Sequence, residues 1–143
     1  MKLSIGLVAF PIEFDNGDKD FIRFNPNDPA LSIRMRDFEK KVNDRIAKVS
    51  DIKLNADGTP EDVSTIEQFR EIHTIVCDEL DVAFGAPVSK VAFKHCSPFA
   101  IVGDTYFILL FLEALKPEIE KSIRDAKEKA EAKLNKHIAK YKK

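Results

Sequence analysis

The chain has few of the residues on which catalytic and metal sites are often built. Its 143 residues include two Cys, three His and five Gly, and Trp is absent. The Gly residues are nowhere grouped into a loop that could cradle a phosphate. The two Cys are expected to be reduced thiols, with Cys77 a small residue of the core, because a disulfide would require the fold to bring Cys96 to it.

Long hydrophobic runs are also lacking. The longest apolar window, 98–115, is interrupted by Gly103 and Glu113, so it does not read as a membrane span. The N-terminus resembles a signal peptide only weakly, because Pro11 and Glu13 follow its apolar part where a small-residue cleavage site would be. The sequence therefore predicts a soluble, cytoplasmic protein, in the host cell cytoplasm if the protein is viral.

Charge is nearly balanced over the whole chain but unevenly distributed along it. The formal net charge is −1, with 44% apolar and 33% charged residues, which allows one modest core and argues against disorder. Residues 116–143 contain ten basic and five acidic residues and so carry +5, which leaves −6 for residues 1–115. We expect a single domain, hairpin plus helical core, over 1–115 and a charged helical tail over 116–143.

The first 24 residues have the pattern of a β-hairpin. Apolar residues alternate from Val8 to Phe14, and an Asn-Gly pair at 16–17 is the strongest short-range hairpin signal. The hairpin is expected over 3–24, with a bulge where the alternation changes phase before Val8. Pro11 lacks a backbone donor, so its strand must lie at a sheet edge or bulge there.

Two amphipathic helices are predicted after the hairpin. Asp28 suits the N-cap of the first helix and Pro29 its first helical position. A cap-like Thr59 before Pro60 marks the start of the second helix, and Gly85 marks its end. Apolar stripes define the expected buried faces: Leu31, Met35, Phe38, Val42, Ile46 and Val49, with Ile52 as a further candidate, in the first helix, and Val63, Ile66, Phe69, Ile72, Val76, Leu80 and Ala83 in the second.

A third helix is predicted from about Asp104 to Leu115, where Pro117 should kink it or force it to restart. Apolar residues in the tail recur about every 3.67 residues, which indicates a helix with one narrow stripe. Such a helix needs a partner surface in its own chain or in another. The expected fold is therefore mainly α: an N-terminal β-hairpin, a small helical bundle and a long charged C-terminal helix. The stripe comprises Ile119, Ile123, Ala126, Ala130, Leu134, Ile138 and Tyr141.

No grouping of residues predicts a catalytic or metal site. His95-Cys96 could suggest a thiol nucleophile, but adjacent residues rarely orient their side chains as base and nucleophile. His73 and Cys77 have the i, i+4 spacing of metal ligands, yet two ligands on an apolar face favour core packing. Segment 25–29 lacks the acidic ladder and terminal Glu of a calcium loop, so a capping turn is the preferred interpretation. We expect a non-enzymatic protein without metal or cofactor.

The Lys-rich tail admits two interpretations. Its lysines could contact phosphates, but acidic residues are interleaved with them and no aromatic ladder accompanies the charge. Docking on protein is favoured, either in a homo-oligomer or with another protein, through exposed apolar surface on residues 106–115 and on the tail stripe. The residues expected to carry this contact are Tyr106, Phe107, Phe111, Ile123 and Leu134.

The order of these elements and three short segments resembles a known family. The segments are FNPNDP at 24–29, VAFG at 82–85 and FILLFLEALKPEI at 107–119. They are similar to tail-assembly chaperones, small proteins from the tail gene clusters of long-tailed phages of Gram-positive bacteria. The resemblance implies a mostly helical, self-associating protein without catalytic residues, which coats the apolar tape-measure protein and recruits tail-tube subunits during morphogenesis.

Two other classes of protein remain open from the sequence. One is a persistent structural component of a phage tail or similar particle, in which the hairpin joins the sheet of a neighbour by strand addition. The other is a small helical regulator that binds nucleic acid through its tail, with an affinity that falls steeply with salt.

Overall fold

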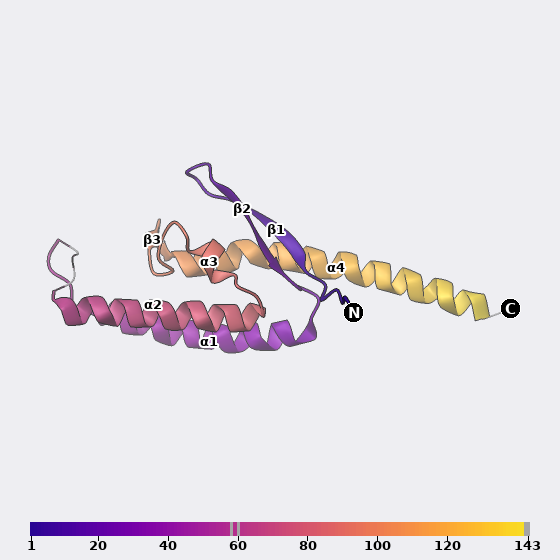
Figure 1. Ribbon diagram of the computed structural model, residues 1–143, viewed down its shortest axis with the longest axis horizontal. Coiled ribbons are helices and arrows are strands. Elements are labelled where there is room, and N and C mark those ends of the chain that lie inside the picture. Colours follow the sequence, from indigo (N-terminus) through magenta and orange to yellow (C-terminus); the bar gives the residue numbers. More distant parts are fainter. Residues whose placement is uncertain (58, 60, 142–143) are drawn as a thin grey trace.

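The computed structural model describes residues 1–57, 59 and 61–141 (Figure 1). It is mostly helical with an N-terminal antiparallel hairpin and a long C-terminal helix, so the fold class predicted from the sequence is confirmed. The elements in chain order are β1 (Val8–Glu13), β2 (Lys19–Phe24), α1 (Pro29–Ser50), α2 (Val63–Phe84), α3 (Ser89–Ala92), β3 (Ile101–Val102), β4 (Thr105–Tyr106) and α4 (Phe107–Tyr141).

The helices and the hairpin form two layers. Helices α1 and α2 lie side by side and antiparallel, and the hairpin, α3 and α4 lie on one side of this pair (Figure 1). Helix α4 continues well beyond the other elements toward the C-terminus. The chain therefore consists of a packed body and a projecting helical tail.

The hairpin explains how a strand can contain a proline. Phe14 N donates to Asp18 O at 2.9 Å across the turn, where Gly17 adopts a φ of 89°. Hydrogen-bonded pairs alternate with non-hydrogen-bonded pairs along an antiparallel ladder, so Pro11, opposite Phe21, falls in a non-hydrogen-bonded pair. The donor that proline lacks would point to the outer edge of β1, where its absence breaks no bond to β2.

The first strand begins later than the sequence predicts. Residues 1–7 have no regular secondary structure, so the bulge expected before Val8 does not form, and Gly6 in this segment has a φ of 75°. Asn25 Nδ2 donates to Ile5 O at 3.0 Å and holds the segment against the end of β2. A Cβ added to Gly6 would lie 2.9 Å from that same nitrogen and would force the Asn25 side chain to shift, and the positive φ itself favours glycine.

The core lies where the hairpin meets the helices. Phe24 is 0% exposed, stacks on Phe10 at a ring distance of 4.7 Å and meets Phe84 edge-on at 4.7 Å. These rings join β1, β2 and α2. The other buried apolar residues are Ile22, Leu31, Phe38, Val42, Val76, Leu80, Ala83, Val88, Ala92, Phe99, Ile108, Phe111 and Leu115.

Helix α1 matches the sequence prediction except that it ends at Ser50, before Ile52, and its stripe from Leu31 to Val49 packs in or against the core. Helix α2 differs at its start. Its N-cap is Asp62, and Thr59 instead donates to Asp57, while the predicted first position, Pro60, lies outside the described residues. The sequence predicts that Val63 and Ile66 are buried, but both are exposed, because this end of α2 projects past β3 and α4 (Figure 1).

The last helix begins later than predicted and is continuous with the predicted helical tail. Residues 101–106 form the two short strands β3 and β4 around Gly103, whose φ is 65°, and the sequence does not predict this turn. Helix α4 then continues through Pro117 without restarting. Both Pro117 and Glu113, whose carbonyl loses its helical donor, are exposed, so water can bond that carbonyl.

Candidate partner-binding groove

Helices α1 and α4 form the walls of a wide groove of about 1050 Å³. Its surface is predominantly apolar, with large side chains from α1, the end of α2 and the first half of α4. These side chains are Leu31, Met35, Val42, Phe84, Leu109, Leu112, Leu115, Ile119 and Ile123, followed by the small residues Ala126 and Ala130.

One end of the groove is built by the start of α1. Asp28 caps the helix by accepting from Ala30 N at 3.0 Å, as predicted from the sequence. Arg34 Nε donates to Ala83 O at 2.9 Å and so satisfies a carbonyl in the last turn of α2. These bonds fix where α1 begins relative to α2, and they thereby place Leu31 on the groove wall.

An ion pair fixes the middle of α1. Both Arg45 Nη2 and Arg45 Nε bond Glu79 Oε1, at 2.7 and 3.2 Å. The two side chains are 23% and 17% exposed, so the pair is largely removed from water. It ties α1 to α2 and holds the α1 wall of the groove against the rest of the body.

Charged side chains line the groove beside the body and give it a net negative charge. Four are acidic and two are basic, so their formal charge is −2. Lys127 also lines the groove, but it lies where the tail leaves the body and is not included in this charge. The acidic side chains are Asp28, Glu39, Glu113 and Glu120, and the basic ones are Arg36 and Lys116.

The structure does not bring the five predicted partner-binding residues together. Ile123 lines the groove and is 41% exposed, and Leu134 is 57% exposed further along α4. Tyr106 and Phe107 are half-buried. Phe111 is buried in the core of its own chain, with 8% exposure.

The expected exposed surface on residues 106–115 is therefore largely covered. Phe93 meets Phe107 and Phe111 edge-on at 6.0 and 6.2 Å, and Ile108 and Leu115 are also buried. Phe93 directly follows the four-residue helix α3. A segment this short has no apolar periodicity from which the packing of Phe93 on α4 could be predicted. Exposed apolar surface is instead found along the groove and the tail stripe.

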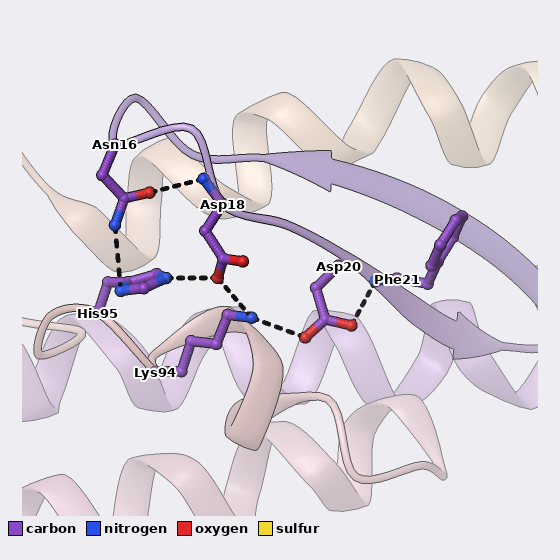
Figure 2. Close-up of polar contacts among 6 residues, drawn as sticks. All are labelled: Asn16, Asp18, Asp20, Phe21, Lys94 and His95. Carbon is purple, nitrogen blue, oxygen red and sulfur yellow. Dashed lines mark hydrogen bonds and ion pairs between the residues drawn. The ribbon is translucent and has the colours of Figure 1, made fainter.

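A polar cluster, here called the latch, joins the tip of the hairpin to the loop after α3 (Figure 2). Lys94 Nζ lies 2.7 Å from Asp18 Oδ2 and 2.8 Å from Asp20 Oδ2. His95 Nε2 lies 2.7 Å from Asp18 Oδ2, and its Nδ1 lies 3.4 Å from Asn16 Nδ2. These contacts bridge distant parts of the sequence, so local patterns do not reveal them.

The latch controls the protonation of Asp18. Hydrogen bonds from Lys94 and then His95 lower the pKa of Asp18 from 3.8 to about 2, and the Asp18 bond raises the pKa of Lys94 above 10.5. The stability that Asp18 adds to the folded state through this lowered pKa is complete above pH 3.8 and is lost as pH falls through about 2. The stability that Lys94 adds through its raised pKa is lost as pH rises above 10.5. The latch should therefore remain closed near neutral pH.

Replacing Lys94 with methionine should return the pKa of Asp18 from about 2 toward 3.8, because its strongest hydrogen-bond donor is removed. Titration of the Asp18 carboxyl carbon by NMR measures this shift. Lys90→Met, at an exposed position of α3, provides the control and should leave the Asp18 titration unchanged. An Asp18 midpoint that stays near 2 in Lys94→Met would contradict the latch geometry.

The cysteines are both free, as expected from the sequence, but Cys77 is only half-buried and is not among the core residues that the sequence predicts it to join. Burial raises the pKa of Cys77 and of Cys96, which keeps both thiols protonated near neutral pH and so weakly nucleophilic. Cys77 Sγ lies 3.6 Å from His73 Nε2 within α2. The cysteine of the His73–Cys77 pair and that of the His95–Cys96 pair are therefore not activated thiolates.

Neither the comparisons nor the described side chains point to a known activity. Family models, curated proteins and solved structures were compared with the chain, and none matches. Within the described residues, no three His, Cys, Asp or Glu side chains are grouped as a metal site. None of the helices described here combines the length and apolar character that crossing a membrane requires. The groove is the feature from which a function can be argued.

Proposed function

We propose that this protein is a non-enzymatic phage tail-assembly chaperone whose groove receives an apolar helical segment of a tape-measure or tail-tube protein. A groove between two helices is a common docking site for an amphipathic helix, whose apolar side chains recur at i, i+3, i+4 and i+7. The α1 and α4 walls provide such a site, lined mostly by apolar side chains together with several charged ones. This groove is the observation that carries the proposal.

The segments that resemble the chaperone family support the same site. Residues 26–29 from the first segment line one end of the groove, and Phe84 from the second contributes an aromatic ring. The third segment, 107–119, forms much of the α4 wall. Three segments far apart in the sequence therefore contribute to one surface.

The chemistry of the groove suits transient binding. Each large aliphatic side chain that leaves water for such a surface contributes about 1.5–3 kcal/mol before the cost of ordering the partner is subtracted. A few such anchors support release as well as capture, which a chaperone requires. The hairpin is less suited to a permanent contact by strand addition, because Pro11 removes a donor from the outer edge of β1.

A peptide of about 20 residues with leucines at helical spacing tests the proposal, since a helix of that length spans about 30 Å. Fluorescence anisotropy should show binding of this peptide and weaker binding of a scrambled isomer that has the same composition but no apolar stripe. Ile123→Asp should weaken binding at least tenfold, because it places a charge in the groove.

Ile33→Asp is the matched control. Ile33 is 67% exposed on α1 and lies outside the groove, so this variant should bind the peptide as the wild type does. Equal binding of the peptide and its scrambled isomer, or equal losses in both variants, would contradict the proposal.

A further inference from the structure

The apolar stripe of α4 continues beyond the groove onto the projecting tail. Ile123 and Ala130 line the groove, and the same period brings Leu134, Ile138 and Tyr141 to the same side of the helix. These last three side chains are 57%, 43% and 75% exposed. The groove and the tail are thus two exposed parts of one apolar surface.

The tail cannot cover its own groove. Helix α4 is continuous from Phe107 to Tyr141, and its end points away from the body (Figure 1). A continuous helix cannot fold back along itself, so its distal stripe can lie against a groove only if the groove belongs to another molecule. The same chain thus provides both an apolar groove and an exposed helix of suitable character.

We propose that the groove of the isolated protein is occupied by the tail helix, residues 127–141, of a second copy, and that the exchange is reciprocal. The two α4 helices run antiparallel about a two-fold axis near Ala126. This inference rests on the proposed function, which gives the groove an apolar helix as its occupant. It adds that the helix of a tape-measure or tail-tube protein must displace the tail of the second copy before it can bind.

The lengths of the two parts agree with this arrangement. At a rise of about 1.5 Å per residue, the tail from Ala126 to Tyr141 is about 22 Å long, and the groove wall from Leu109 to Ala126 is about 26 Å long. Ala126 and Ala130 have small side chains, so two helices can approach closely where they cross. A two-fold arrangement buries the same stripe on both copies.

The charges are also complementary. Residues 127–141 contain five Lys and two Glu, which gives +3, whereas the charged side chains of the groove beside the body give −2. Reciprocal exchange brings each positive tail to a negative groove, and both contacts form at once. This pairing favours a second copy over an uncharged apolar helix as the occupant.

Sedimentation equilibrium of the full chain tests the exchange. The wild type should form a dimer of the 16.2 kDa chain, and Leu134→Asp with Ile138→Asp should be monomeric with an unchanged far-ultraviolet dichroism spectrum. Ile33→Asp with Val82→Asp, at exposed positions outside the groove, should remain dimeric. A monomeric wild type, an oligomer larger than a dimer, or a dimer that survives the tail substitutions would overturn the proposal.

Cross-linking tests the direction of the helices. A cysteine at Ala126 should form a disulfide with its counterpart across the two-fold axis, whereas a cysteine at His137 should not, because its counterpart lies at the opposite end of the interface. Efficient cross-linking of Ala126→Cys alone supports the antiparallel arrangement. Efficient cross-linking of His137→Cys would instead show parallel tails and overturn it.

The peptide assay separates this proposal from the proposed function. The Leu134→Asp and Ile138→Asp variant has an unoccupied groove, so it should bind the helical peptide several-fold more tightly than the dimeric wild type. Dimerisation without peptide binding by either protein would refute the proposed function and leave the exchange standing. Peptide binding of equal strength by both proteins would refute the exchange alone.

Discussion

Phe24→Ala should lower the free energy of unfolding by about 3–5 kcal/mol, the usual cost of truncating a buried aromatic side chain. Phe24 is 0% exposed, and its ring packs against both Phe10 and Phe84. The substitution therefore leaves a cavity at the point where both strands meet α2. Since small domains are stable by only about 5–15 kcal/mol, this loss should move the urea midpoint strongly.

Phe21→Ala is the control in the same strand. Phe21 is 45% exposed, and its ring lies beneath the Arg23 guanidinium at 5.4 Å. We expect a loss of about 1 kcal/mol or less, since an exposed cation–π contact contributes about 0.5–1 kcal/mol. Similar losses for Phe24→Ala and Phe21→Ala would show that the hairpin does not pack on α2 as described.

Arg45→Met should destabilise the protein by about 2 kcal/mol. Removing one member of a buried ion pair typically costs about 3–5 kcal/mol, and the partial exposure of this pair reduces that cost. The Glu79 carboxylate would lose its only described ion-pair partner, and its Oε2 has no hydrogen-bond partner among the described residues. Urea unfolding followed by circular dichroism measures the loss.

The double variant Arg45→Met with Glu79→Leu separates charge from packing. Replacing both members by apolar residues removes the uncompensated carboxylate, so most of the lost stability should return. A double variant as unstable as Arg45→Met would show that the aliphatic part of Arg45, and not its charge, holds α1 against α2. A fully stable single variant would exclude a structural role for the pair.

The elements that could be predicted from the sequence are those that depend on local bonds and local periodicity. Asp28 caps α1 because a carboxylate can accept backbone N–H bonds within two residues, and Gly85 ends α2 because its φ of 64° disfavours other residues. The Asn-Gly turn forms for the same local reason. In each case, the residues that decide the structure are neighbours in the chain.

The sequence predictions are wrong where contacts between residues far apart in the chain determine the structure. Residues 106–115 have the composition of an exposed docking helix, but Phe93 and the core cover most of them. Residues 3–7 alternate like a strand, but they form no ladder with β2, and the bond from Asn25 to Ile5 holds them beside the end of that strand without strand pairing. Propensity describes what a segment can do alone, and tertiary packing selects among those alternatives.

The sequence by itself determined the mainly helical class, the hairpin, the first helix with its cap, and the narrow apolar stripe of the tail, because periodicity and capping are properties of neighbouring residues. Only the tertiary structure decided that α1 and α4 enclose a groove, that the latch closes the hairpin tip, and that α4 carries its stripe away from the body. Those features depend on contacts between residues far apart in the chain, which no local pattern encodes.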